Sequence, residues 1–177
     1  MNQAIRELAE NVAVPFETAR AMPKSVYTSD EFLKAEIEHI FKQDWFCAGR
    51  ADSLANAGDY LTLTLAGQPI MVLRDHQGFL RAQSNVCRHR MSTLLEGRGQ
   101  IKTITCPYHA WAFRLDGGLI GGPYMQRTDG FVPAEHRLVP LAIEVWEGFV
   151  FVSQAADPAP LAPRLAGLTE VLAPYRL

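Results

Sequence analysis

The stretch Cys87-Arg88-His89 is followed, after sixteen intervening residues, by the similar stretch Cys106-Pro107-Tyr108-His109. Two such compact pairs of one Cys and one His predict two loops that close on a single metal centre. Two thiolates and two imidazoles suit either a tetrahedral zinc ion or a [2Fe–2S] cluster. Classical zinc modules space their two cysteines about two to four residues apart and their two histidines about three to five apart. Here each loop supplies one Cys and one His, which favours a cluster whose two irons bind the cysteines and the histidines respectively. Structural zinc remains the main alternative.

Four segments extend this pattern into a family resemblance: Asn85-Val86-Cys87-Arg88-His89-Arg90, Cys106-Pro107-Tyr108-His109-Ala110-Trp111, Phe113-Arg114-Leu115-Asp116-Gly117 and Trp146-Glu147-Gly148-Phe149-Val150-Phe151-Val152. In these segments the chain resembles the N-terminal Rieske [2Fe–2S] domain of the alpha subunit of Rieske non-haem iron oxygenases, the aromatic-ring-hydroxylating type. The resemblance spans roughly residues 25–155. It implies that no residue of this chain is catalytic and that one Rieske cluster is bound by four ligands, Cys87, His89, Cys106 and His109.

Two positions next to the ligand loops depart from the family pattern. Members of the family usually carry Gly where this chain has Met91 and Ala110. Ala is a small change from Gly. Met91 is larger, and it puts the local backbone conformation or the cover of the cluster in question.

Three residues beside the ligands are further candidates for the site, namely Arg90, Tyr108 and Trp111. The two aromatic residues would shield the cluster, and Tyr108 has a hydroxyl that can donate to a sulfur; plain core packing explains both equally well. Arg88 and Arg90 bracket His89 and give this rim positive charge. Such a rim suits an acidic reductase or ferredoxin partner, and it suits a merely solvated surface as well.

Composition describes an ordinary globular protein, with 48% hydrophobic and 20% charged residues among 177. The formal net charge of −2 gives no reason to expect a nucleic acid or an anionic membrane as a partner. No apolar run reaches the roughly 20 residues that span a bilayer. Residues 1–14 lack the basic and apolar regions of a signal peptide. We therefore expect neither a nucleic-acid nor a membrane protein.

The cysteines bear on the compartment and on the subfamily. Once Cys87 and Cys106 are ligands, only Cys47 is left, so no disulfide can form among the rest. This usage predicts a cytoplasmic protein. Rieske proteins of respiratory complexes carry one more cysteine in each ligand loop, and those two form a disulfide. The resemblance puts Ser92 and Tyr108 at these positions, so the disulfide-bearing, high-potential type is not expected.

The hydrophobic pattern changes from a helical period to a strand period near Trp45. Ser29-Asp30-Glu31 offers an N-cap and an acidic first turn for a helix that reaches about Asp44. From there on, stretches such as Tyr60–Leu65 alternate apolar residues with Thr, as half-buried strands do. Three stretches predict turns, the last two as hairpins: Gly97-Arg98-Gly99, Asp116-Gly117-Gly118 and Glu147-Gly148. Strands are expected from Ile101 to Thr105 and from Trp111 to Leu115, on either side of the second Cys–His stretch.

Many short strands with Gly-rich turns predict a mainly β fold, an antiparallel β-sandwich or small barrel with an N-terminal helical segment. The resemblance implies that this is the Rieske iron–sulfur fold.

Three parts are expected along the chain. A helical extension covers residues 1–45, and the Rieske [2Fe–2S] domain covers residues 46–155. Residues 156–177 form a linker, Pro-rich to Pro163, and the start of a catalytic domain that is itself absent, with a helix from Leu165.

The resemblance implies that this chain transfers electrons as part of a monooxygenase or dioxygenase. Full oxygenases continue into a catalytic domain, where two His and one carboxylate hold a mononuclear Fe(II). No such motif is visible here, since the other histidines, His39, His76 and His136, are far apart. A reductase or ferredoxin would supply the electrons. The catalytic domain of the same or a neighbouring subunit of a homo-oligomer, a trimer by resemblance, would receive them.

Two other functions remain open from the residues alone. A free-standing Rieske ferredoxin would carry the same cluster, but such proteins are usually much shorter and lack a helical extension like residues 1–45. A zinc-stabilised interaction module is the other alternative. For the substrate, Tyr27–Phe32 and Asn85–Arg90 look more like oxygenases that act on quaternary amines than like the naphthalene type.

Overall fold

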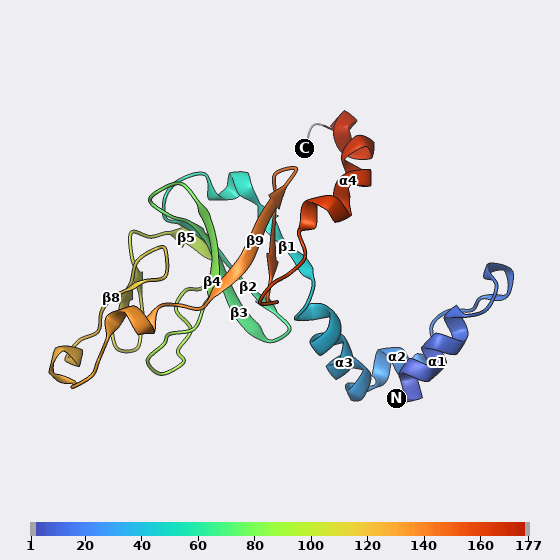
Figure 1. Cartoon of the computed structure of the whole chain (residues 1–177), viewed down its shortest axis with the longest axis horizontal. Coiled ribbons are helices and arrows are strands. Elements are labelled where there is room, and N and C mark those ends of the chain that lie inside the picture. The colour runs from blue at the N-terminus through green and yellow to red at the C-terminus, as the bar shows by residue number, and fades with distance from the viewer. Residues whose placement is uncertain (1–2, 176–177) are drawn as a thin grey trace. The chain divides into compact units, whose positions relative to one another are not determined.

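The computed structural model describes residues 3–175, apart from the side chain of Gln126. The chain divides into two compact units, residues 1–43 and residues 44–177. The first unit is helical, and the second consists mainly of antiparallel sheet with a few helical turns and one longer helix (Figure 1). The predicted fold class, mainly β with an N-terminal helical segment, is confirmed. The predicted domain boundaries at residues 45 and 155 stay predictions.

The helical unit contains five short elements: α1 (Gln3–Val12), a 3-10 turn (Phe16–Thr18), α2 (Lys24–Thr28), α3 (Asp30–Glu36) and a π-helical turn (Ile37–Phe41). Ser29 caps α3 as predicted, because its Oγ accepts a hydrogen bond from the backbone N–H of Phe32 at 3.2 Å. The predicted helix to about Asp44 ends at Phe41 instead, and it is α-helical only to Glu36. From Ile37 on, the backbone hydrogen bonds change from an i to i−4 spacing to an i to i−5 spacing. The N–H of Lys42, for example, donates to the carbonyl of Ile37 at 3.0 Å.

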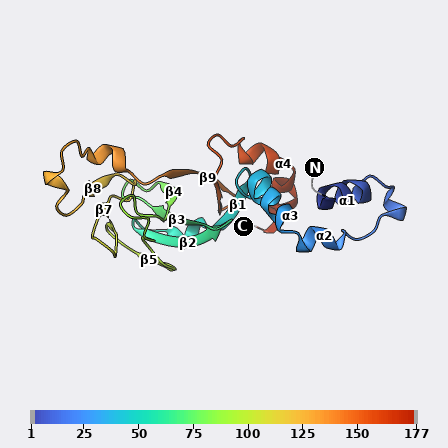
Figure 2. The same ribbon diagram turned by 90° about the horizontal axis from the view of Figure 1, so that it is seen from below.

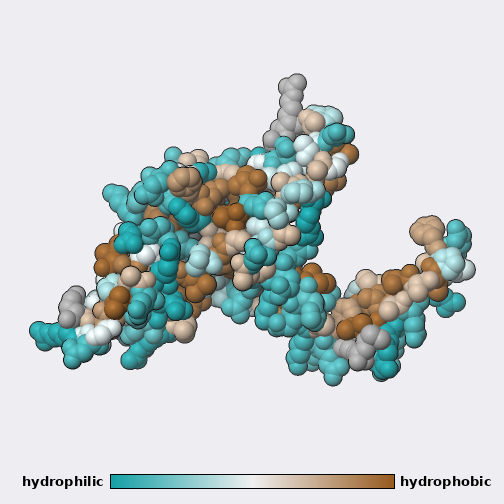
Figure 3. Space-filling model, in the orientation of Figure 1, coloured by the Kyte–Doolittle hydropathy of each residue, from teal (hydrophilic) through white to brown (hydrophobic). Residues whose placement is uncertain are grey.

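Apolar residues are visible along the helical unit in Figure 3. A groove of about 490 Å³ runs between its helices, and its lining includes Leu8, Met22, Phe32 and Ile40. Phe32 and Ala4 are buried within this unit. The burial of Phe32 agrees with the apolar spacing that predicted a helix after Ser29.

A seven-stranded antiparallel sheet is the largest element of the second unit (Figures 1 and 2). Its strands lie in the order β1-β10-β9-β4-β3-β2-β5. Their bounds are β1 (Trp45–Arg50), β2 (Asp59–Leu65), β3 (Gln68–Arg74), β4 (Leu80–Ser84), β5 (Arg98–Gln100), β9 (Pro140–Trp146) and β10 (Phe149–Ser153). The sheet is curled in both views, as the native twist of strands requires.

A separate three-stranded sheet carries the second of the two Cys–His stretches. It consists of β6 (Ile104–Thr105), β7 (Ala112–Phe113) and β8 (Leu119–Gly121) in sequence order. The hairpin predicted at Asp116-Gly117-Gly118 joins β7 to β8, with φ +87° at Gly117. The strands themselves are shorter than predicted, because the backbone leaves the ladder to build the loops around the Cys and His residues.

The large sheet has a buried core on each face, and β3 contributes to both. We call the first the sheet core; its buried members are Leu54, Leu61, Val72, Ala82, Val150 and Val152. We call the second the cysteine-side core; its buried members are Met71, Leu73, Cys87, Leu94, Ile104, Cys106, Trp111, Phe113, Leu115, Leu119 and Leu138. Val72 and its neighbours Met71 and Leu73 point to opposite faces because side chains alternate along a strand.

Turn residues explain two of the connections. Glu147 and Gly148 have φ +46° and +74° and join β9 to β10 as a two-residue hairpin, as predicted. The turn predicted over Gly97-Arg98-Gly99 is confined to Gly97, with φ +64°, since Arg98 and Gly99 already belong to β5. A Cβ on Gly99 would lie 3.0 Å from the ring of Tyr60, so any other residue here would require that ring to shift.

The last helix, α4 (Leu161–Leu172), begins four residues before the predicted Leu165 and is followed by a 3-10 turn (Ala173–Tyr175). Pro163 lies inside its first turn, where a residue without an N–H is tolerated because no intrahelical bond is lost. The carboxylate of Glu144 accepts from the N–H of Leu161 at 3.2 Å and satisfies the helix end. Among residues 3–175, no helix combines the length and the hydropathy needed to cross a membrane.

Candidate metal centre

Two loops with the same closing hydrogen bonds present the four candidate ligands. In the first loop, the N–H of Cys87 donates to the carbonyl of Ser92 at 2.8 Å, and the N–H of Met91 donates to the carbonyl of Cys87 at 3.1 Å. In the second loop, the N–H of Cys106 donates to the backbone carbonyl of Trp111 at 2.8 Å, and the N–H of Ala110 donates to the backbone carbonyl of Cys106 at 3.0 Å. Each cysteine is therefore the base of a tight backbone loop that ends shortly after the histidine.

Met91 and Ala110 both adopt the left-handed backbone conformation, with φ +55° and +54°. This conformation lets each loop turn back on its cysteine, and it is the one that Gly adopts without a steric cost. Gly would suit both positions, in agreement with the family pattern that the resemblance implied. The Met91 side chain is 69% exposed, so it does not disturb the buried sulfur side of the loop.

The two thiols lie deep in the cysteine-side core, with Cys87 1% and Cys106 3% exposed. Burial raises the pKa of the Cys87 thiol, although the N–H groups of His89 and Arg90 point at its sulfur. For Cys106 burial also acts upward, but the N–H groups of Tyr108 and His109 outweigh it and lower the pKa. Backbone N–H groups therefore favour thiolate at both sulfurs, against the effect of burial.

The two imidazoles face each other, with His89 and His109 ring centroids 4.9 Å apart and planes at 68°. Nδ1 of His109 is buried and has no hydrogen-bond partner among the described protein atoms. A buried ring nitrogen left free in this way is suited to bind a metal ion. Burial, then the charges of His109 and Arg90, lower the pKa of His89, which keeps this ring neutral as a ligand must be.

The three residues predicted beside the ligands lie in different surroundings. Trp111 is 3% exposed and stacks on His89, with ring centroids 4.8 Å apart and planes within 3° of parallel. Tyr108 stacks on His109 at 3.7 Å but is 60% exposed. Arg90 is exposed. Trp111 therefore covers one imidazole from the core, and Tyr108 covers the other at the surface.

The four candidate ligands come together as two like pairs. The thiols of Cys87 and Cys106 interact with each other, and the rings of His89 and His109 contact each other. Within residues 3–175, no three Cys, His, Asp or Glu side chains converge on one point that a single ion would occupy. His39 and His76 lie elsewhere, and His76 contacts the carbonyl of Lys102 at 3.3 Å.

The sequence model of the Rieske [2Fe–2S] domain matches residues 44–143, more than half of the chain and all four candidate ligands. The chain belongs to the Rieske [2Fe–2S] domain family. The cofactor of this family is a Rieske [2Fe–2S] cluster, which agrees with the two like pairs of side chains and with the free nitrogen of His109.

Relatives of this Rieske domain are oxygenase subunits. The carnitine monooxygenase oxygenase subunit of Escherichia coli (strain K12) is 38% identical over 162 residues, which are 91% of this chain and 43% of that protein. The glycine betaine monooxygenase oxygenase subunit of Chromohalobacter salexigens is 35% identical over 158 residues, 89% of this chain and 35% of that protein. The chain thus spans less than half the length of these relatives.

Solved structures show the same fold. The apo form of a quaternary ammonium Rieske monooxygenase is similar with a TM-score of 0.84 and 37% identity, over 88% of this chain and 46% of that chain. A naphthalene 1,2-dioxygenase with bound indole is similar with a TM-score of 0.79 and 27% identity, over 84% of this chain and 34% of that chain.

Sequence reasoning missed several residues that support this Rieske domain. Phe131 and His136 both contact Trp111, each with ring centroids 5.7 Å from it, and Nδ1 of His136 lies 2.9 Å from the carbonyl of Val132. Their segment looked irregular and offered no signal. Gln83 and Asn85 are buried amides at the end of β4. Arg81, Gln83 and Asn85 alternate along the chain as the polar side of a strand would, so no sequence signal marked the two amides as buried.

Proposed function

We propose that this chain is the electron-transfer domain of a Rieske oxygenase. In this function Cys87, His89, Cys106 and His109 bind one [2Fe–2S] cluster, which accepts and releases one electron at a time. The observation that carries the proposal is the presentation of two buried thiols and two neighbouring imidazoles by two matching loops. A pair of like ligands for each of two irons is what a Rieske cluster requires, whereas a zinc ion needs four ligands around one point.

The residues around the ligands perform three tasks in this proposal. Backbone N–H groups of His89, Arg90, Tyr108 and His109 stabilise charge on the sulfurs. The cysteine-side core excludes water from the sulfur side, because both cysteines are almost fully buried. The imidazole side is half-buried and lies next to exposed Tyr108, so electrons would enter and leave there.

The acceptor and the donor are proposed from the relatives. We infer that electrons come from a reductase or ferredoxin and pass to a mononuclear non-haem iron in the catalytic domain of the same or a neighbouring subunit. One similar structure is that of a quaternary ammonium Rieske monooxygenase, which gave insights into carnitine oxidation and inter-subunit electron transfer. A homotrimer with quaternary amine substrates is the corresponding proposal for the oxygenase that contains this chain, and the cytoplasm is its proposed compartment.

Metal analysis of the anaerobically purified chain tests the cluster. Two irons and two acid-labile sulfides per chain are expected, with a visible absorption spectrum and a one-electron reduction. Cys87→Ser should lose the cluster, while Cys47→Ser should keep it, since Cys47 is exposed in β1 and remote in sequence from both ligand loops. One zinc per chain and no sulfide, in a sample made with adequate iron, would overturn the proposal.

Assays with oxygen test the division of labour. The chain with a reductase is expected to accept electrons without forming a hydroxylated or demethylated product from a quaternary amine. Product formation by the chain alone would show that an oxygen-activating site lies within it, and the electron-transfer proposal would have to be replaced.

A further inference from the structure

Two buried amides stand side by side on one face of the strand that leads into the first ligand loop. Gln83 and Asn85 are each 2% exposed. Residues two apart on a strand share a face and lie about 6.7 Å apart. Gln83 pairs with Met71 of β3, so its face is the one that covers the cysteine-side core. Both side chains therefore project toward the part of the molecule that holds the four candidate ligands.

Asn85 closes the first ligand loop. Its Nδ2 donates to the carbonyl of Leu95 at 2.8 Å, and its Oδ1 accepts from the N–H of Leu95 at 2.9 Å. The backbone carbonyl of Asn85 accepts from Leu94 at 3.1 Å, and its N–H donates to the carbonyl of Pro69 on β3 at 2.9 Å. These bonds join both ends of the segment 86–94, which contains Cys87 and His89, and tie them to the large sheet.

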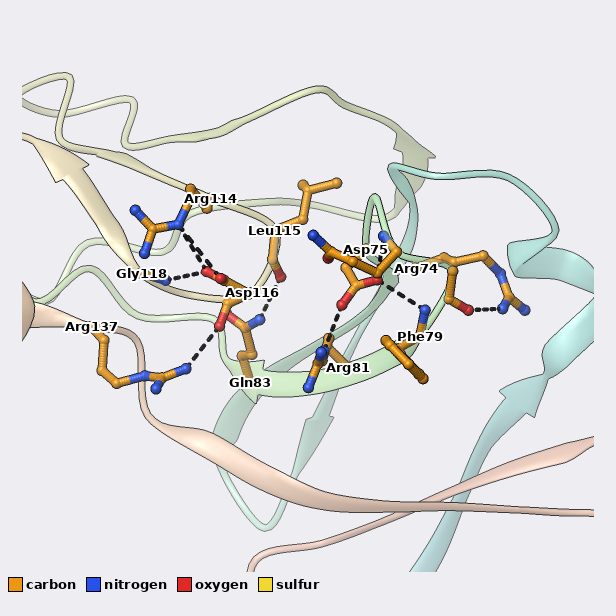
Figure 4. A network of polar contacts seen from close by, with 12 residues as sticks. Arg74, Asp75, Phe79, Arg81, Gln83, Arg114, Leu115, Asp116, Gly118 and Arg137 are labelled. Carbon is orange, nitrogen blue, oxygen red and sulfur yellow. Dashed lines mark hydrogen bonds and ion pairs between the residues drawn. The ribbon is translucent and has the colours of Figure 1, made fainter.

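Gln83 holds the second loop in the corresponding way. Its Nε2 donates to the carbonyl of Leu115 at 2.7 Å, a contact between the large sheet and the β7–β8 hairpin (Figure 4). Its Oε1 is buried without a hydrogen-bond partner among the described protein atoms. A Cβ on Gly117 would come within 2.8 Å of this oxygen, and Gly117 has φ +87°. The hairpin is therefore shaped to receive the amide closely.

The two contacts are equivalent with respect to the ligands. Leu95 stands six residues after His89, and Leu115 stands six residues after His109. Gln83 in β4 and Asn85 directly after it therefore hold the two loops at matching points, and the extended backbone between them fixes their spacing. We propose that Gln83 and Asn85 are positioning residues that set the distance between the two ligand loops. This inference rests on the proposed function, because it assumes that the loops hold a cluster.

Amide removal in the full chain tests the proposal. Asn85→Asp keeps the acceptor for the N–H of Leu95 but cannot donate to its carbonyl when ionised, and Gln83→Glu likewise loses the donor to Leu115. Gln83→Met and Asn85→Leu remove all side-chain hydrogen bonds and keep a similar side-chain volume. We expect each variant to release iron to a chelator about tenfold faster than wild type, the lower end of the effect of lost supporting hydrogen bonds. The EPR spectrum of the reduced cluster should broaden and shift, and the reduction potential should change.

Gln154→Met is the matched control. Gln154, directly after β10, makes the same kind of bond, from Nε2 to the carbonyl of Leu65 in β2 at 3.1 Å, and neither strand carries a candidate ligand. It should leave the iron release rate, the EPR spectrum and the potential unchanged. If the Gln83 and Asn85 variants melt at lower temperature but match wild type in all three readouts, the two amides support the fold alone and the inference fails.

Two further outcomes are distinguishable. If Asn85→Leu does not fold, Asn85→Asp decides, because it preserves size and one of the two hydrogen bonds. If wild type carries two irons and two sulfides while the variants behave as wild type, this inference fails and the proposed function stands. If wild type carries no cluster at all, the proposed function fails and the inference falls with it.

Discussion

Trp111 lies flat on His89, with ring centroids 4.8 Å apart and planes 3° from parallel. The indole is 3% exposed, and Phe131 and His136 contact it from the segment between β8 and β9. A Cβ on Gly122 would lie within 2.4 Å of the indole Nε1, so the backbone also packs directly against the ring. The plane of His89, and the direction of its ring nitrogens, is therefore set by a residue that cannot move without the core.

Replacing Trp111 should destabilise the domain and loosen His89. Trp111→Leu is expected to lower the free energy of unfolding by about 3 kcal/mol, because a large buried side chain leaves a cavity, and to lower the iron content. Trp111→Phe should cost less, since a ring remains to stack. Urea denaturation and iron analysis measure both effects. Trp146→Leu, at a half-buried position of the β9–β10 hairpin, is the control and should keep its iron. A Trp111→Leu variant as stable as wild type would contradict the role of the stack.

Glycine at the two left-handed positions should stabilise the ligand loops. Met91 and Ala110 have φ +55° and +54°. An L-residue pays about 1–2 kcal/mol for this conformation, whereas Gly pays about 0.5–1 kcal/mol in chain entropy. Met91→Gly and Ala110→Gly are therefore each expected to raise the free energy of unfolding by about 0.5–1 kcal/mol in urea denaturation. Ala112→Gly in strand β7 is the control and should lower it by about 0.5–1 kcal/mol. A loss of stability in both loop variants would show that the side chains contribute more than the backbone strain costs.

Acid should destabilise the domain through Asp75, a carboxylate 1% exposed at the end of β3 (Figure 4). Burial opposes its ionisation, but Arg81 at 2.7 Å and the N–H groups of Phe79 and Gln77 at 2.9 Å outweigh burial and lower its pKa. Because the folded pKa is below the unfolded value of about 3.9, this stabilisation is complete above that pH. It disappears as the pH falls through the folded pKa.

The variant Asp75→Asn isolates this effect. At neutral pH it should lower the free energy of unfolding by about 1–3 kcal/mol, the cost of losing hydrogen bonds to a buried charge. The difference between wild type and variant should shrink as the pH falls below about 4. Denaturation curves across that range measure it, with the exposed Asp157→Asn as a control for the charge change. A difference that does not depend on pH would mean that Asp75 does not titrate with folding.

Charge at the histidine side should control how fast anionic reductants reach the centre. Arg88 and Arg90 are both exposed on either side of His89. The double variant Arg88→Glu/Arg90→Glu is expected to slow reduction by dithionite about tenfold at low ionic strength. The two arginines attract this anion, whereas two glutamates would repel it. The difference should largely vanish at high salt, where screening is short-ranged. The double variant Arg98→Glu/Lys102→Glu, at two exposed sites outside the ligand loops, carries the same charge change. Equal slowing by this control in stopped-flow measurements would refute a local effect.

Several features were predictable because their causes are local. The cap at Ser29 and the Gly-containing hairpins at Gly117 and Gly148 depend on a few neighbouring residues, and all three were confirmed. The π-helical turn at Ile37–Phe41 and the early start of α4 were not predicted. The start of α4 depends on the hydrogen bond that the N–H of Leu161 donates to Glu144, which lies outside the local pattern.

For the site itself, the spacing C-x-H and C-x-x-H by itself determined which four residues are candidate ligands, because loop closure on a metal needs only short-range spacing. The same spacing favoured separate pairs of thiols and imidazoles, but only the tertiary structure brings the two thiols into one buried core and the two imidazole rings into contact. The contacts that hold the ligand loops in place could not be predicted from the sequence either. Gln83 reaches Leu115 across 32 positions, and Trp111 meets Phe131 and His136 from a segment without regular structure. Contacts of this range depend on which faces of the folded chain meet, and no periodicity along the sequence records that.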